Sequence, residues 1–294
     1  ASKSGVATFV SADEKSCLDD VRFLMSFMPQ NNMEEPPTID TGDDPDRLCP
    51  DLRDILPPSP NQPYDMKKVI ASIVDDGEFF EYFPHWAKSI VCGFVRIDGH
   101  SVGVVGNQPL FLAGVLDIES AEKAARFVRT CDAFGIPLIV IADVQGFLPG
   151  AGQEWEGAVR RGAKLLHAFG EAVVPRVTLI TRRAYGGAYV AMNSKSLGAT
   201  RVFAWPEAEV SVMGAVAAVR VLHRRLLADI PVEQREAMEL ELAAEHEKVS
   251  GGVAKAIEIG AVDEMITPAQ TRSALAKSIA NAPHRRGSHG NIPL

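Results

Sequence analysis

The hydrophobic and polar positions along this chain follow two periods, and each period predicts one kind of element. Apolar residues that recur every three or four positions are typical of a helix with one buried face. Helices are expected at 12–28, from 66 to about 76, at 117–134 and at roughly 153–170. Asp117 or Ser120 is available to cap the third of these.

Compact apolar runs rich in β-branched residues predict buried strands. Two runs within 90–107 are joined by Asp98-Gly99, a dipeptide typical of hairpin turns. Further strands are expected at 136–144, 174–181, 200–205 and 208–215, followed by a helix-rich tail to about 280. Short strands in pairs, each pair followed by a helix, predict an α/β fold with one largely buried sheet.

The segment 29–65 interrupts this pattern. It holds nine of the nineteen prolines and many acidic residues, so no regular structure is expected there. We interpret it as an extended linker that wraps over a surface. The sequence therefore divides into a connecting helix with an acidic linker, 1–65, and a domain, 66–294.

Composition narrows the classes of function. The chain has 294 residues, 46% of them hydrophobic, and no apolar run near the roughly 20 residues that span a bilayer, so no membrane partner is expected. The net charge is −8 and basic residues are scattered, which disfavours nucleic-acid binding. The start lacks Met and a signal pattern, so we expect a piece of a longer protein.

Cysteine and histidine spacing disfavours a metal site. The four cysteines are far apart, with no CxxC pair, and the seven histidines show no HExxH or other ligand spacing. No metal is expected in this chain, and a reducing cytoplasm fits unpaired cysteines. A GxSxG elbow for a serine nucleophile is also missing from the sequence.

Two glycine turns are the candidate chemistry. The runs "IVIADVQGFLPG" and "TLITRRAYGGAY" each lead from a buried strand through glycine towards a helix. The first N–H groups of a helix have no acceptor within it. Those of Gly187 and Ala188 would together donate to an oxygen that gains negative charge, as in an oxyanion hole.

Other interpretations of these turns stay open. Paired glycines also occur at strand-to-helix turns because they allow tight packing. A phosphate cradle is disfavoured, since neither GxGxxG nor GxxxxGK[ST] is present. Tyr185 and Tyr189 are four residues apart and either line one pocket wall or pack on a helix face. Any chemistry here would depend on backbone dipoles and not on a side-chain nucleophile.

Several blocks of the sequence resemble one known family. These are "GNQP" (106–109), "ARFVRTCDAFGIPLIVIADVQGFLPG" (125–150), "RRGAKLLHAFGEAVVPRVTLITRRAYGGAY" (160–189), "AWPEAEVSVMGA" (204–215) and "HGNIPL" (289–294). In order and spacing they are similar to the carboxyltransferase β subunits of biotin-dependent acyl-CoA carboxylases, which include propionyl-CoA carboxylase. The opening residues resemble the join between the two halves of those subunits.

The resemblance implies a crotonase-like fold of repeated ββα units and corresponds to the second of the family's two such domains. It implies an enzyme that moves CO₂ from carboxybiotin to the α-carbon of an acyl-CoA. The implied partners are a biotin carboxylase and biotin carrier α subunit, other carboxyltransferase subunits in a homo- or hetero-hexamer, and an N-terminal half of the same subunit. Because the active site forms between halves of neighbouring subunits, this chain alone would bind part of the substrate set.

The resemblance also implies roles for individual residues. Gly187 and Ala188 match the N–H donors for the biotin ureido oxygen. It assigns biotin binding to Gly146, Phe147, Tyr185 and Gly186, and acyl-CoA binding to Tyr189, Val190, Met213 and Gly214.

Two positions depart from the family pattern. Gln145 stands where the family has proline, which puts the rigidity of that turn in doubt. Val190 is apolar and branched where an acid or cysteine occurs, which favours a longer acyl chain or is ordinary packing. A decarboxylase or transcarboxylase subunit, and a non-catalytic scaffold, stay open as alternative functions.

Overall fold

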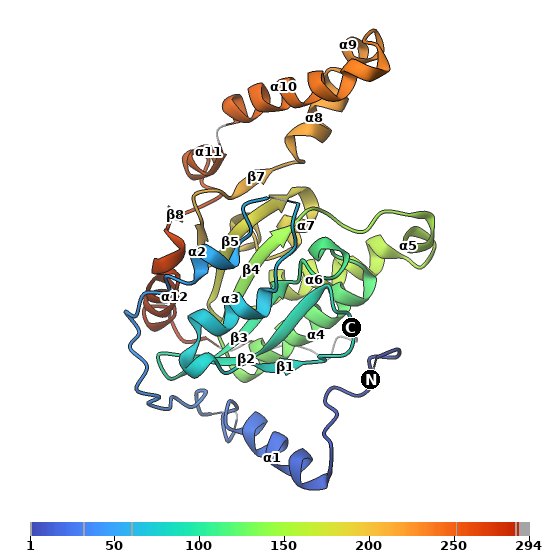
Figure 1. Cartoon of the computed structure of the whole chain (residues 1–294). Coiled ribbons are helices and arrows are strands. Elements are labelled where there is room, and N and C mark those ends of the chain that lie inside the picture. Colours follow the sequence, from blue (N-terminus) through green and yellow to red (C-terminus); the bar gives the residue numbers. More distant parts are fainter. Residues whose placement is uncertain (1, 32, 60, 251, 286, 288–294) are drawn as a thin grey trace.

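The computed structural model describes residues 2–31, 33–59, 61–250, 252–285 and 287, so the terminal "HGNIPL" block lies outside the described residues. Eight strands are found in this part of the chain: β1 (Phe80–Tyr82), β2 (Ile90–Ile97), β3 (His100–Asn107), β4 (Leu138–Val144), β5 (Arg176–Tyr185), β6 (Arg201–Ala204), β7 (Glu209–Ser211) and β8 (Glu264–Met265). They form one sheet in the order β1-β2-β3-β4-β5-β6-β8, and β7 pairs with the end of β5 (Figure 1). The first three strands are antiparallel and all later pairs are parallel.

Helices cover both faces of this sheet. Those described are α1 (Glu14–Met25), α2 (Leu52–Ile55), α3 (Met66–Ile73), α4 (Ile118–Phe134), α5 (Ala151–Trp155), α6 (Ala158–Glu171), α7 (Gly186–Ala191), α8 (Ala215–Leu222), α9 (Arg224–Ala228), α10 (Val232–Ser250), α11 (Gly252–Glu258) and α12 (Thr271–Ala280). Alternate residues of β4 divide between two cores: Val140 packs with α4, α6 and α7, whereas Ile139 packs with α3 and α12. The predicted α/β fold with a buried sheet is confirmed.

The central predictions for single elements are also confirmed. β2 and β3 form the hairpin, with Ile97 opposite His100 across the Asp98-Gly99 turn. Asp117 and Ser120 both cap α4: the Asp117 carboxylate accepts the Ser120 N–H at 2.8 Å, and the Ser120 hydroxyl accepts the Asp117 N–H at 2.8 Å. This reciprocal arrangement satisfies two N–H groups that the helix itself leaves free.

Several boundaries differ from the prediction. The helix expected from 66 to 76 ends at Ile73 and gives way to a 3₁₀ turn at Asp75–Gly77. The helix expected at 153–170 is two helices, α5 and α6, because Gly157 between them has a left-handed backbone with φ of 86°. β5 runs on to Tyr185, so "RRAY" is strand and not loop.

The expectation that 29–65 holds no regular structure is wrong at one place, since α2 forms a short helix there. The same segment also contributes to the core. Cys49, Leu52 and Tyr64 are buried with α3 and α12. An apolar residue every few positions is enough to fix an otherwise extended chain on the sheet.

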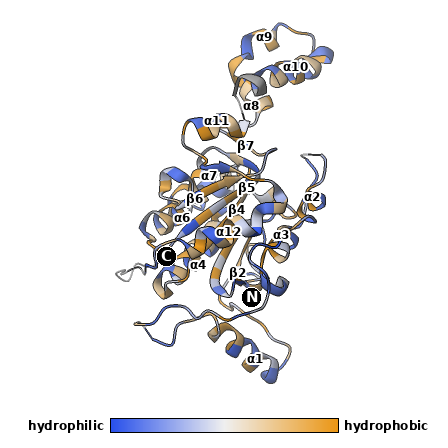
Figure 2. Cartoon of the chain, turned by 90° about the vertical axis from the view of Figure 1, so that its left-hand side faces the viewer, coloured by the Kyte–Doolittle hydropathy of each residue, from blue (hydrophilic) through white to orange (hydrophobic). Residues whose placement is uncertain are grey.

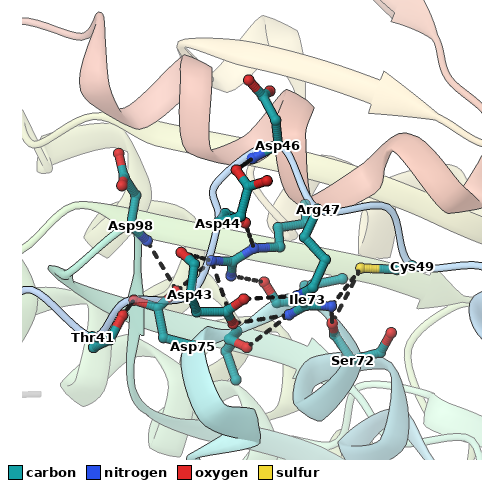
Figure 3. A network of polar contacts seen from close by, with 12 residues as sticks. Thr41, Asp43, Asp44, Asp46, Arg47, Cys49, Ser72, Ile73, Asp75 and Asp98 are labelled. Atoms are coloured by element: carbon teal, nitrogen blue, oxygen red, sulfur yellow. Dashed lines mark hydrogen bonds and ion pairs between the residues drawn. The ribbon is translucent and has the colours of Figure 1, made fainter.

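A polar network around a buried ion pair ties this segment to the domain (Figure 3). The Arg272 guanidinium of α12 lies 2.7 Å from the Asp75 carboxylate, and both side chains are almost fully buried. Arg272 also donates to the main-chain carbonyls of Asp43 and Asp44, at 3.1 and 2.9 Å. Asp75 accepts the Gly99 N–H at 2.7 Å. The linker, the hairpin turn and α12 thus share one network, although the proposed boundary at 65/66 stays a prediction.

The helices α8, α9 and α10 form an arm that extends beyond the sheet, at the end opposite α1 (Figures 1 and 2). Its small core contains Val219, Leu227 and Ala243. The arm follows directly from β7, so it begins beside the end of β5.

Candidate functional site

The two glycine turns are neighbours at one edge of the sheet. β4 and β5 are parallel, and Val144 near the end of β4 pairs with Ala184 near the end of β5. Gly146 lies two residues after Val144, and Gly186 lies two residues after Ala184. Carboxyl ends of adjacent parallel strands are a common place for ligands in α/β sheets.

The two glycines of the second turn, Gly186 and Gly187, differ in whether the fold has room for a side chain at their position. Gly186 has φ of 55°, and a Cβ there would lie 2.9 Å from the Val212 carbonyl oxygen. Gly187 has no such constraint, because no heavy atom lies within 4 Å of a Cβ built on it. Tight packing therefore accounts for Gly186 and does not account for Gly187.

The N–H groups of Gly187 and Ala188 are unpaired within the part of the chain that the structure describes. Both lie in the first turn of α7, where N–H groups have no acceptor in the helix. The Ala188 side chain is buried, whereas Gly187 is exposed. The turn therefore has two adjacent N–H groups without acceptors, one on the exposed Gly187 and one on Ala188, which is 1% exposed.

The glycine turn at Gly146 is fixed to the loop after β3. The Leu116 N–H donates to the Gly146 carbonyl at 3.1 Å, and the Leu148 N–H donates to the Leu116 carbonyl at 2.7 Å. The Phe147 ring lies against α6, 3.1 Å from where a Cβ of Gly162 would stand. Beside Gly146 itself no heavy atom lies within 4 Å of a Cβ position. The turn is thus held by main-chain bonds although it has Gln145 in place of proline.

Tyr185, Gly186 and Gly214 come together beneath the second turn. The Tyr185 hydroxyl donates to the Glu209 carboxylate of β7. Burial, and then this bond, raise the pKa of Tyr185, so it stays protonated. A Cβ at Gly214 would lie 3.3 Å from the Tyr185 ring. The ring therefore supports the chain between β7 and α8.

The other predicted site residues are placed differently. Tyr189 packs into the core with α4 and α6, as the helix-packing alternative expects. Its buried hydroxyl has no partner among the described residues, and burial raises its pKa. Val190 is about one-third exposed on α7. Met213 lines a pocket of about 200 Å³ with Glu209, Ser211 and Ala215.

A buried charged group that was not predicted from the sequence lies behind these turns. Asp143 in β4 is 2% exposed and forms an ion pair with Arg182 of β5 at 2.9 Å. An aspartate inside an apolar strand run is a signal that was available, because carboxylates are rarely buried without a partner.

Metal ligands and membrane-spanning helices are both missing from the residues that the structure describes. These residues contain no group of three or more His, Cys, Asp and Glu side chains placed to hold a metal ion. None of their helices combines the length and apolar character needed to cross a bilayer.

The mixed α/β fold of this chain is crotonase-like, and solved relatives share it. A solved structure of transcarboxylase 12S, a hexamer with methylmalonyl-coenzyme A and methylmalonic acid bound, superposes on all of this chain and 57% of that chain with a TM-score of 0.91 and 41% identity. The predicted fold class is confirmed.

The chain belongs to the carboxyl transferase domain family, which matches residues 1–289. It is 55% identical over 293 residues to a biotin-dependent acetyl-/propionyl-coenzyme A carboxylase beta6 subunit of Mycobacterium tuberculosis, covering 99% of this chain and 61% of that protein. It is 46% identical over 298 residues to the methylmalonyl-CoA decarboxylase subunit alpha of Veillonella parvula, covering 100% of this chain and 57% of the relative. The chain thus spans about three-fifths of the length of these relatives.

Proposed function

We propose that this chain is the carboxyltransferase part of an acyl-CoA carboxylase, corresponding to the second half of its longer relatives, with 66–294 as the crotonase-like domain. The observation that carries the proposal is the pair of unpaired N–H groups at Gly187 and Ala188, beside the Gly146 turn, in a member of this family. The cytoplasmic location stays a prediction.

The turns fit the biotin ureido ring. The space beside Gly187 and Gly146 is open, so a planar ring has room to approach the main chain at both turns. When bound, carboxybiotin would supply the carboxyl group that is transferred to the α-carbon of the acyl-CoA. The N–H groups of Gly187 and Ala188 would donate to the ureido oxygen and stabilise its developing negative charge. Gly146 and Phe147 would hold the opposite edge of the ring.

The remaining site residues would shape the acyl-CoA side. Tyr185, Gly186 and Gly214 fix the second turn, while Val190 and Met213 are each about one-third exposed and available to an acyl-CoA. Tyr189 would act through the core that supports α7. A branched apolar Val190 favours a longer acyl chain. The partners we propose are a biotin carboxylase and biotin carrier subunit, further carboxyltransferase subunits, and an N-terminal half.

A second candidate is the reverse use of the same site. One relative is named a methylmalonyl-CoA decarboxylase subunit and one solved relative is a transcarboxylase. Carboxyl transfer from an acyl-CoA to biotin would need the same two donors, because catalysis must stabilise the same charge in both directions. Assaying both directions with the assembled enzyme distinguishes the candidates.

The test of the proposed role is Gly187→Val in the assembled enzyme. A valine side chain would occupy the open space beside the donors, so we expect kcat for carboxyl transfer to fall by about 10²- to 10³-fold, the usual effect of losing one oxyanion-hole donor. Transfer of a ¹⁴C carboxyl group measures it. Gly170→Val, on the exposed end of α6 at the opposite edge of the sheet, is the control. Wild-type turnover by Gly187→Val would refute the donor role.

A further inference from the structure

β5 carries a bulge directly before the candidate donors. Ala142 of β4 pairs with Ile180 of β5, and the next pair is Val144 with Ala184. Between these two pairs β4 advances by two residues and β5 by four. Residues 181–183 of β5 therefore lie opposite the single residue Asp143. A bulge leaves main-chain groups without ladder partners and bends the strand, so something must fix it.

The Asp143 carboxylate fills this gap. One oxygen accepts the main-chain N–H of Arg183 at 3.2 Å. The other accepts from Arg182 Nε at 3.0 Å, and Arg182 Nη2 lies 2.9 Å away. The carboxylate thus bonds both a main-chain donor that the bulge displaces and a guanidinium that balances its charge. A buried carboxylate with such partners is held in one position.

Asp143 is itself held from the β3 side. Its N–H donates to Asn107 Oδ1 at 3.2 Å, and Asn107 Nδ2 donates to the Gly114 carbonyl at 3.0 Å. Asn107 is fully buried. Polar bonds therefore run from the loop after β3, through Asp143, to β5.

Arg182 is also held by contacts with the segment before α3. Its guanidinium stacks 4.9 Å from the centre of the Tyr64 ring and donates to the Gln62 carbonyl at 2.9 Å. The Tyr64 hydroxyl lies 2.9 Å from the Thr181 hydroxyl, inside the bulge. Burial, and then the charge of Asp143, raise the pKa of Tyr64, so the phenol stays neutral.

Each residue between the bulge and the donors is held by strand pairing or by close packing. Arg183, Ala184 and Tyr185 pair with β7, and Ala184 also pairs with Val144. Gly186 then lies against Val212. A shift of Arg183 is therefore passed to Gly187, four residues on.

We propose that Asp143 is a positioning residue whose carboxylate fixes the β5 bulge and so sets the Gly187 and Ala188 amides level with the Gly146 turn. This inference rests on the proposed function. Catalytic donors must be placed to within a fraction of an ångström, and misplacement by about 1 Å costs on the order of 100-fold in rate.

Three variants of Asp143 in the assembled enzyme test the inference. Asp143→Ala removes the acceptor for Arg183, and we expect kcat to fall about 100-fold with KM within about threefold, since transition-state contacts are lost and not uniform binding. Asp143→Leu fills the same space without an acceptor and gives the same result if the alanine variant does not fold. Asp143→Asn keeps one oxygen for the Arg183 N–H, so its kcat stays within about tenfold of wild type.

Asp132 is the matched control. It is a fully buried aspartate that accepts the Val173 and Val174 N–H groups at 2.7 and 2.9 Å, at the opposite end of β5. Asp132→Ala should lower the melting temperature, yet leave kcat of the folded enzyme within about threefold. Amide hydrogen exchange on the chain should accelerate at 182–188 in Asp143→Leu and not in Asp132→Ala.

Each outcome decides the question. Near-wild-type kcat for folded Asp143→Leu overturns the inference, as does a 100-fold loss in Asp143→Asn or an equal loss in Asp132→Ala. If Gly187→Val is inactive while Asp143→Leu is active, only the positioning role fails. If Gly187→Val is active, the donor role itself fails.

Discussion

The adjacent glycines at 186 and 187 are present for different reasons: the fold requires a glycine at 186, whereas at 187 it leaves open space beside the main chain. A glycine with a left-handed backbone and no room for a side chain is required by the fold. A glycine with an ordinary backbone and open space beside it is not. The sequence "GG" does not distinguish the two positions, because the difference arises from the Val212 carbonyl, which packs against Gly186 and not against Gly187.

These two glycines give a paired prediction for stability. Gly186→Ala forces an L-residue into a left-handed conformation and 2.9 Å from the Val212 oxygen, so we expect unfolding free energy to fall by about 1–3 kcal/mol. Gly187→Ala should change it by less than about 1 kcal/mol in either direction. Urea unfolding of the two variants measures the difference. Equal losses would contradict the distinction drawn between the two positions.

At the element scale, local signals predicted much of the fold. The Asp98-Gly99 hairpin and the capped α4 were predictable because their determinants lie within a few residues of each other. The β5 bulge was not, since it is defined only by pairing with β4, some forty residues earlier. The turn at Gly146 and the turn at Gly187 were found from sequence, but the Asp143 carboxylate that joins their strands was not.

The pair of helices α4 and α6 gives a prediction for pH dependence. Glu122 of α4 accepts from Arg161 at 2.7 Å and Lys164 at 2.8 Å, both on α6. The Arg161 bond, with help from Lys164, lowers the pKa of Glu122 from 4.5 to about 2. Because the folded-state pKa lies below the unfolded value, this stabilisation is complete above about pH 4.5 and is lost as the pH falls towards 2.

Glu122→Gln tests this linkage. The variant should lose about 1 kcal/mol of unfolding free energy at pH 7, in the range expected for a partly exposed ion-pair network. Its stability should also decline less steeply than wild type between pH 4.5 and 2. Glu258→Gln, which removes an exposed i,i+3 pair with Lys255, is the control and should change neither value. If the unfolding free energies of Glu122→Gln and wild type decline with the same slope between pH 4.5 and 2, the linkage is ruled out.

At the scale of the whole molecule, the chain has two parts of very different packing. The body has cores on both faces of the sheet, and the linker is tied into it by the bonds that Arg272 donates to the Asp43 and Asp44 carbonyls. The arm depends on a small cluster of its own. Exposed apolar side chains on it include Val221 and Leu222, each about two-thirds exposed. Its position could not be read from helical periodicity, which predicts helices and not where they lie.

This difference predicts that the arm opens independently of the body. Segments with few buried contacts exchange their amide hydrogens through local opening, at a lower free energy than global unfolding. In native-state hydrogen exchange at rising urea, amides of α8 and α10 should exchange at concentrations where those of β4 and α4 remain fully protected. Because the arm leaves β7 beside Tyr185 and Gly214, its opening would free Met213 while the Asp143-held bulge keeps Gly187 in place. Exchange of α10 and β4 in one cooperative step would show instead that the arm is part of the same folding unit.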